Sequence, residues 1–179
     1  MDTFRSFGSG LPLRVVRMLV VVFLVAAAVA AFGWSVRGSV VPRAAEQKPA
    51  SGTIGVTQRE ILFSYRQGRD VVQERLVHRQ LTGTFSGVEV AVVRYAIHPD
   101  HSATIRATSS CSCTLEGKAG TVTFADEASV SAAGDISAKR KVIDATGGLA
   151  GLRSTVTVTG PIAAPTQAYS GHYAFGGDD

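Results

Sequence analysis

The sequence predicts an all-β domain, an eight-stranded antiparallel up-and-down barrel, preceded by one N-terminal apolar helix. Beyond residue 52, apolar and polar residues alternate with a period of two, which is typical of half-buried strands. Turn residues divide this part of the chain into about eight short runs. No segment after Trp34 carries an apolar stripe of helical period bounded by caps.

Consecutive short hairpins favour a barrel, because a barrel closes its own sheet edges. A two-sheet sandwich of the immunoglobulin kind is the alternative. It is disfavoured because the cysteines lack the inter-sheet spacing and because the only tryptophan, Trp34, lies in the N-terminal apolar run.

The chain begins with a basic head that contains Arg5, Arg14 and Arg17, followed by the uncharged run Met18 to Trp34. This run approaches the length of a membrane span, with Trp34 at the interface, which favours an uncleaved anchor. A cleaved signal peptide stays open, because Ala28-Val29-Ala30 has the form of a cleavage site. The excess of arginine before the run places the rest of the chain outside the cytoplasm on either interpretation.

The expected organisation is therefore a signal anchor or signal peptide over 1–34, a flexible linker over 35–51 and a β-barrel domain over 52–179. The linker contains two prolines and small residues without a sustained period.

The predicted strands follow in order, separated by turns at 66–69, at Ser86-Gly87, at 98–101, at 117–120 and at 132–135. Residues 88–98 are apolar on both faces, so that strand is expected to be buried on both sides. The alternation is cleanest over 103–116 and puts both cysteines on the packed face. The strands are expected at 53–65, 70–85, 88–98, 103–116, about 122–130, 136–143, 154–160 and 168–175.

The segment Asp144 to Arg153 (DATGGLAGLR) joins two of these strands and predicts a plug for one end of the barrel. Gly147 and Gly148 can adopt positive φ, and Gly151 permits close backbone approach. We expect Leu149 and Leu152 to be tucked under the end of the sheet as a result.

Cys111 and Cys113 are separated by one serine, so they share a face of their strand. In an extended strand their Cα atoms would be about 6.5–7 Å apart, near the limit for a disulfide, so that a bridge would need a bulge or would be strained. Two buried free thiols are an equally favoured alternative to a disulfide.

The composition excludes several function classes. The net charge is +4, and no Lys/Arg cluster is interleaved with aromatic residues, which argues against nucleic-acid binding. The H-x-x-H sequence of His98 and His101 lies in a turn and predicts solvated side chains, so we expect no metal and no cofactor. No G-x-S-x-G nucleophile motif is present, and the other histidines, His78 and His172, suggest no catalytic set.

Four segments carry a resemblance to a known family: LTGTFSG at 81–87, CTLEGKAGTVTF at 113–124, ATGGLAGL at 145–152 and YSGHY at 169–173. Over about residues 53–175 the chain resembles the bacterial DUF3224 family, which is frequent in actinobacteria. The resemblance implies a small calycin-like barrel, related to the allene oxide cyclase-like and dirigent-like barrels, with no established reaction. Relative to that family, the N-terminal membrane segment and the Cys111-Ser-Cys113 pair are departures, and the cysteines suggest adaptation to an oxidising exterior.

Two functions arise as hypotheses. The first is a binding or interaction module, tethered to the membrane through its N-terminal helix or secreted, that holds a small hydrophobic ligand. The alternative is a cofactor-independent isomerase or cyclase acting on a small apolar substrate in the barrel. It requires an ionisable side chain inside, for which Glu89, Arg94, Asp126 and Arg140 are the candidates. The sequence favours binding and predicts no oligomeric state.

Overall fold

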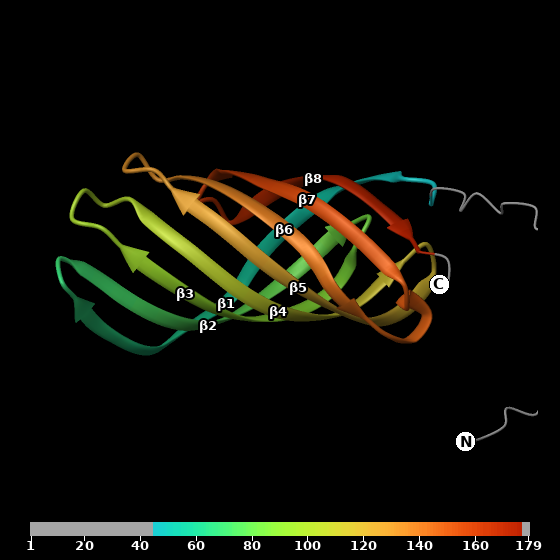
Figure 1. The fold of residues 1–179 in the computed structure, drawn as a ribbon, viewed down its shortest axis with the longest axis horizontal. Helices are drawn as coiled ribbons and strands as arrows, with labels where there is room; N and C mark the ends of the chain where they lie inside the picture. The colour runs from blue at the N-terminus through green and yellow to red at the C-terminus, as the bar shows by residue number, and fades with distance from the viewer. Residues whose placement is uncertain (1–44, 177–179) are drawn as a thin grey trace, which may run out of the picture. The chain divides into compact units, whose positions relative to one another are not determined.

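The computed structural model describes residues 45–176, which form a single antiparallel sheet (Figure 1). Each strand pairs with its neighbours in the chain, and the first strand also pairs with the last, so the sheet closes into an eight-stranded barrel. The strands are β1 (Lys48–Gln67), β2 (Asp70–Gly83), β3 (Ser86–Ile97), β4 (Ala103–Leu115), β5 (Lys118–Val130), β6 (Asp135–Ala145), β7 (Leu152–Pro161) and β8 (Thr166–Phe175).

The predicted N-terminal membrane segment and most of the linker lie outside the described residues. Among residues 45–176, no helix has the length and apolar character of a membrane span. The end of the predicted linker is wrong, because residues 48–51 already belong to β1, where they pair with residues 170–173 of β8. Ala50 is buried in the core, so these residues close the barrel and are not a spacer.

Strict alternation makes β4 the clearest strand, as the sequence predicts. Every second residue from Ala103 to Leu115 is buried, and the residues between them are exposed. In a closed sheet one face of each strand must point into the barrel, so the apolar residues of β4 and Ser109 lie inside, while its threonines and the other serines face solvent.

The turn predicted at Ser86-Gly87 is wrong, since both residues belong to β3. The chain bends instead at Thr84-Phe85, where the Thr84 amide donates to the carbonyl of Ser51 at 2.8 Å. The Phe85 amide donates to the Tyr169 hydroxyl at 2.9 Å, and the Phe85 ring is buried in the core. Because the Phe85 side chain is anchored in the core, the chain bends before Ser86 and Gly87.

The expectation that β3 is buried on both faces is also wrong. Val88, Val90 and Val92 are 55%, 39% and 45% exposed, whereas Glu89, Ala91 and Val93 between them are fully buried. The described residues form one sheet with no second layer, so the outer face of β3 has nothing to pack against. An apolar side chain at these positions therefore remains in contact with solvent.

The glycine-rich segment forms a short 3₁₀ helix, Gly147–Leu149, and both Leu149 and Leu152 are buried, as expected for a plug. Gly147 and Gly151 have positive φ angles of 66° and 76°. Gly148 does not, and in that respect the prediction is wrong. Its lack of a side chain serves close approach, because an added Cβ would lie 2.9 Å from the carbonyl oxygen of Ala119.

Cys111 and Cys113 form a disulfide with a Cα–Cα distance of 5.3 Å. The disulfide forms without the bulge that was one of the two expectations, since β4 pairs with β3 and β5 through both cysteines without a register shift. The strand is less extended here than the ideal geometry assumed, which brings the two Cα atoms within disulfide range.

We predict that Leu149→Ala lowers the free energy of unfolding by about 2–5 kcal/mol, because it leaves a cavity where a fully buried side chain seals the barrel. Urea unfolding of the full-length protein in non-ionic detergent, followed by circular dichroism, measures the change. The matched control is Ile143→Ala, whose side chain is 56% exposed and whose loss should cost less than about 1 kcal/mol. Equal effects of the two substitutions would show that the plug is not packed.

Candidate functional site

Three of the four ionisable candidates point into the barrel. Glu89 on β3, Asp126 on β5 and Arg140 on β6 are 0%, 9% and 2% exposed. The fourth, Arg94, lies on the outer face, where its guanidinium donates to the Tyr65 hydroxyl at 3.1 Å. Arg94 is therefore excluded as a group acting inside the barrel.

Arg79 on β2, which was not among the predicted candidates, joins these three residues in a buried ion-pair cluster. Its Nη1 donates to Glu89 Oε1 at 2.9 Å and to Asp126 Oδ2 at 3.1 Å. Arg140 Nη2 donates to Glu89 Oε2 and, at 2.9 Å, to the Ser109 hydroxyl on β4. Arg140 Nε lies 3.5 Å from Asp126 Oδ1.

Strand register explains why these residues meet. Arg79 is paired with Glu89, and Asp126 with Arg140, directly across neighbouring strands. Ser109 occupies the inward face of β4 between these two pairs. The five successive strands β2 to β6 thus each contribute one side chain to a single polar layer of the barrel interior.

On β2 and β5 this polar layer lies between two apolar parts of the core, whereas on β6 the residues on either side of Arg140 belong to one of them. On β5, Phe124 belongs to the apolar cluster that contains the plug leucines, and Val130 belongs to a second cluster on the other side of Asp126. On β2, Leu81 and Val77 flank Arg79 in the same way. Charged groups at this depth are costly unless they are paired, so the ion pairs are a requirement of the position.

The electrostatics of the cluster are balanced. Two guanidinium groups face two carboxylates, so the formal charge of the layer is zero. Burial works against the charge on Arg79, but the carboxylates of Glu89 and Asp126 outweigh it and hold the pKa of Arg79 above its ordinary value. The Arg140 guanidinium also stacks on the Phe124 ring, 3.9 Å from its centroid.

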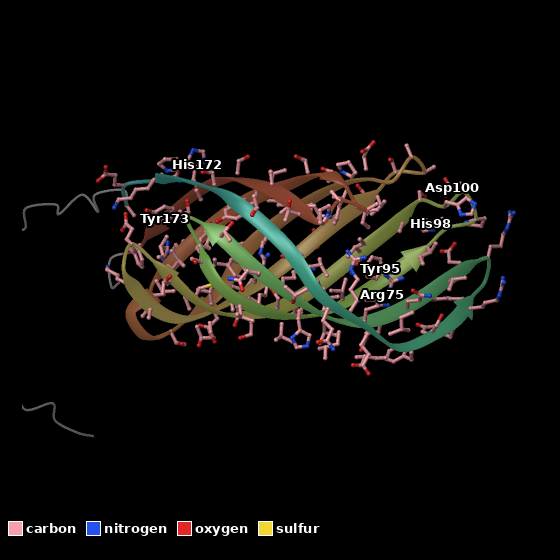
Figure 2. All side chains as sticks on the ribbon, turned by 180° about the vertical axis from the view of Figure 1, so that it is seen from behind. Arg75, Tyr95, His98, Asp100, His172 and Tyr173 are labelled. Atoms are coloured by element: carbon pink, nitrogen blue, oxygen red, sulfur yellow. A yellow bond between two sulfur atoms is a disulfide. The ribbon has the colours of Figure 1, made fainter. Side chains whose placement is uncertain are left out.

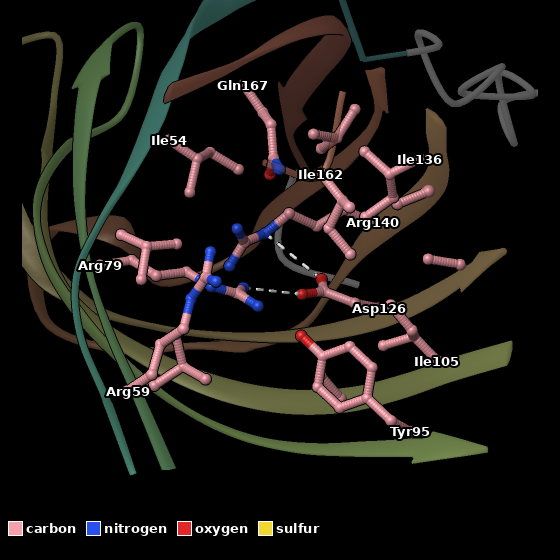
Figure 3. Close-up of a pocket in the computed structure, with 16 residues that line it drawn as sticks. Ile54, Arg59, Arg79, Tyr95, Ile105, Asp126, Ile136, Arg140, Ile162 and Gln167 are labelled. Carbon is pink, nitrogen blue, oxygen red and sulfur yellow. Dashed lines mark hydrogen bonds and ion pairs between the residues drawn. The ribbon is translucent and has the colours of Figure 1, made fainter. Parts of the chain in front are cut away.

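A cavity of about 60 Å³ lies against this layer (Figure 3). In Figure 3 the side chains of Arg59, Arg79, Arg140 and Asp126 converge on one region, with the Tyr95 hydroxyl directed toward it. The polar part of the wall consists of Arg59, Arg79, Tyr95, Asp126, Arg140 and Gln167. The apolar part consists of Ile54, Val56, Val77, Ile105, Ala107, Ala128, Ile136, Ala138, Val158 and Ile162.

The interior is otherwise filled by side chains. Toward the plug, the Phe85 ring packs edge-on against Phe124 at 5.7 Å and lies 6.2 Å from the Tyr169 ring. The remaining space there, beside Phe85, is about 10 Å³, at or below what one water molecule needs. The cavity on the side of the polar layer away from the plug is therefore the larger of these two interior spaces.

Three buried atoms of the polar layer have no hydrogen-bond partner: Asp126 Oδ1, Arg140 Nε and Arg140 Nη1. Asp126 and Arg140 both line the cavity, whereas Glu89 and Ser109 do not. The two oxygens of Glu89 are both occupied by arginine donors. The unused hydrogen-bonding capacity of the layer therefore belongs to the residues that border the cavity.

The sequence contained a signal for two of the missed residues. Arg79 lies between Val77 and Leu81, which the period-two pattern assigns to the inward face of their strand. Ser109 lies in the same way between Ala107 and Cys111. A polar residue on an otherwise apolar face is the informative exception in such a pattern.

The polar positions that the sequence analysis set aside contribute nothing to this site. Figure 2 shows His98 and Asp100 at the end of the barrel opposite His172 and Tyr173. His98 Nδ1 lies 3.2 Å from Asp70 Oδ1, outside the barrel interior. Within residues 45–176, no group of His, Cys, Asp and Glu side chains is arranged to hold a metal ion.

Glu127, the neighbour of Asp126, faces solvent, so the two carboxylates lie on opposite faces of β5 as the alternation predicts. They cannot act together on one group.

Comparison with solved structures supports the fold. No family model matches the chain, and no curated protein matches it in sequence. The fold is similar to the crystal structure of a protein of unknown function of the DUF3224 family from Shewanella oneidensis MR-1, with a TM-score of 0.63 and 17% identity. The alignment covers 74% of this chain and 100% of that one. At this identity the likeness establishes the fold alone.

We predict that Glu89→Gln lowers the free energy of unfolding by about 3–5 kcal/mol, because it leaves two buried guanidinium groups facing one carboxylate. Urea unfolding of the full-length protein measures the change. Glu127→Gln removes the same charge from the exposed face of β5 and should change stability by less than about 0.5 kcal/mol. A loss of similar size in both variants would contradict a desolvated cluster.

Proposed function

We propose that this protein is a small-molecule-binding barrel of the DUF3224 type, held at the outer surface of a membrane by its N-terminal segment, or secreted if that segment is cleaved. The observation that carries the binding function is the cavity beside the buried ion-pair layer. It combines a mostly apolar wall with a few polar side chains that converge on one region, which is the usual composition of a ligand site.

The size of the cavity limits the ligand. A volume of about 60 Å³ is less than half of the roughly 150 Å³ that holds benzene, so the enclosed part of a ligand has about two or three non-hydrogen atoms. Gln167 and Ile162 on the wall are half-buried, and Arg59 is exposed, so the cavity can be reached from solvent. A longer ligand would extend outward along these residues.

Family membership rests on two lines of support. The sequence carries the segments LTGTFSG, ATGGLAGL and YSGHY, and the fold is similar to that of a DUF3224 protein. The eight-stranded closed sheet is also compatible with a relationship to the allene oxide cyclase-like barrels, which we propose on fold grounds only.

The proposed location is supported by the chain itself. The run Met18 to Trp34 has the composition of a membrane segment, and the arginines that precede it favour export of the residues after Trp34. The disulfide between Cys111 and Cys113 supports an oxidising compartment, because disulfides persist mainly outside the cytosol.

A cofactor-independent isomerase or cyclase is the second candidate. It is favoured by the buried carboxylate of Asp126 at the cavity wall, which could accept a proton from a substrate. Both carboxylates of the layer are engaged by arginines, however, and a base that is held in ion pairs is better suited to positioning a ligand than to abstracting a proton. Binding is therefore the function we propose.

We predict that xenon enters the cavity of the full-length protein in detergent micelles and shifts the methyl NMR signals of Ile105 and Ile136 in a saturable way, because small apolar atoms occupy apolar cavities. Ala128→Leu places a larger side chain in the cavity and should abolish these shifts. The matched control, Ala125→Leu, faces outward on the same strand and should leave them unchanged. Absence of saturable shifts in the unmodified protein would refute an accessible cavity.

A further inference from the structure

We propose that the distal edge of β1, residues 56–67, is a docking site for an acidic, extended polypeptide segment, which adds to the barrel wall as a further strand. The inference goes beyond the proposed binding function, because it concerns the surface of the wall and not the interior. Three features support it: an unpaired strand edge, a groove along that edge, and arginine side chains that have no acidic partner among the described residues.

The distal edge of β1 has a pairing partner on one side only. β1 continues past the start of β8 toward the turn into β2 (Figure 1). Its pairing with β8 ends at Gly55, and within residues 45–176 the stretch 56–67 pairs with β2 alone. No described turn or loop bonds to the backbone of this stretch. One row of backbone N–H and C=O groups is therefore available to another strand.

Two bulges bend the distal edge without removing that row of groups. They correspond to the register shifts against β2 that follow Val56 and Ile61. A bulge leaves one residue unpaired and curves the strand, while the residues on either side keep their extended backbone. An added strand would follow this curvature.

Large apolar side chains along the distal edge are in contact with solvent. They are Ile61, Leu62, Phe63 and Tyr65. The rings of Phe63 and Tyr65 stack at a centroid distance of 6.3 Å. Exposed apolar side chains beside an unpaired edge are what strand addition uses, since the backbone provides affinity and the side chains provide specificity.

A groove of about 340 Å³ lies where β1 separates from β8. One wall is residues 56–59 of β1, and the other is residues 163–165 of the loop between β7 and β8. Ala163, Ala164 and Pro165 present short apolar surfaces to it. The volume is more than twice the roughly 150 Å³ that holds benzene, so side chains of an added strand fit into the groove.

The charges at the distal edge favour an acidic partner. Arg59, Arg66 and Arg69 are exposed, and none of them forms an ion pair within the described part of the chain. Glu60 is the only carboxylate between residues 56 and 67. Arg59 lines the groove as well as the cavity, where the neighbouring ion-pair layer is already neutral. Acidic side chains on an added strand would therefore balance an excess of positive charge.

The same observations disfavour other occupants. A second copy of the chain would place a second set of these arginines against the first, and like charges across a strand pair are destabilising. An anionic lipid surface would attract the arginines, but hydrocarbon offers no hydrogen-bond partner to a strand edge. The N-terminal segment of this chain is also a poor match, because residues 1–44 contain five arginines and one aspartate.

The test titrates short peptides into the full-length protein in phosphatidylcholine nanodiscs. The probe is a peptide of alternating glutamate and valine. One control has lysine in place of glutamate, and the other is the acidic peptide methylated at every backbone nitrogen, which keeps its charge but cannot donate to the edge. Backbone amide NMR shifts of residues 58–67 give the dissociation constants. We expect the acidic peptide to bind at least about tenfold more tightly than either control and to slow amide exchange along the distal edge.

Paired substitutions locate the binding surface. Arg59→Gln combined with Arg66→Gln should weaken binding of the acidic peptide about fivefold, because each exposed ion pair contributes modestly. Arg106→Gln combined with Lys141→Gln removes the same charge from exposed positions of β4 and β6 and should leave the affinity within about twofold. Equal weakening by the two pairs would contradict docking at the distal edge. If the first pair does not fold, the three peptides on the unmodified protein still decide the matter.

Further outcomes would overturn the proposal in different ways. Equal binding of the methylated peptide would exclude strand addition, and equal binding of the lysine peptide would exclude an acidic partner. Shifts at Phe63 and Tyr65 on replacing one third of the lipid with phosphatidylserine, without peptide, would indicate a membrane surface instead. Protection of the edge amides that rises with protein concentration alone would indicate a second copy. If xenon enters the cavity and no peptide binds, this proposal fails while the binding function stands.

Discussion

The pairing of β1 with β8 is the contact on which the rest of the structure depends. Residues Lys48 to Gly55 join the first strand to the last and convert a sheet of hairpins into a closed surface with an interior. Only a closed sheet gives each strand one face that is screened from water on all sides, and the described residues include no second layer that could do this instead. The alternating pattern, the plug and the buried charges all depend on that enclosure.

Because the interior is enclosed, the ion-pair layer has a high desolvation cost and requires a specific geometry. Four charged side chains are withdrawn from water, and their mutual attraction offsets that cost only when the geometry is good. Hydrophobic side chains of similar volume would serve stability as well or better. The layer is most complete around Glu89, away from the cavity, and incomplete at Asp126 and Arg140, which border it. Stability alone therefore does not explain the layer.

The period-two pattern predicted the number of strands and their order, because alternation in a closed sheet is a local property of the chain. It made Glu89, Asp126 and Arg140 candidates for the interior together with Arg94, which lies on the outer face. It did not predict which residues of different strands meet. The pairing of Arg79 with Glu89 depends on the register of β2 against β3, which is set by the bend at Thr84-Phe85 that the sequence analysis misplaced. The exposure of Val88 likewise depends on the lack of a covering layer, which no single strand encodes.

The two ends of β1 differ in their pairing, and this difference explains the position of the cavity. β1 pairs with β8 only as far as Gly55, and from Val56 to Gln67 its described hydrogen-bonding neighbour is β2 alone. The barrel is therefore sealed along one part of β1 and open along the other, where Val56 and Arg59 border the cavity. Two register shifts interrupt this stretch, which exposes the apolar side chains of Ile61, Leu62 and Phe63 beside the charged residues Arg59, Glu60 and Arg66. The edge without a β8 partner leaves a side entrance to the polar layer, whereas the plug at Leu149 closes the opposite end.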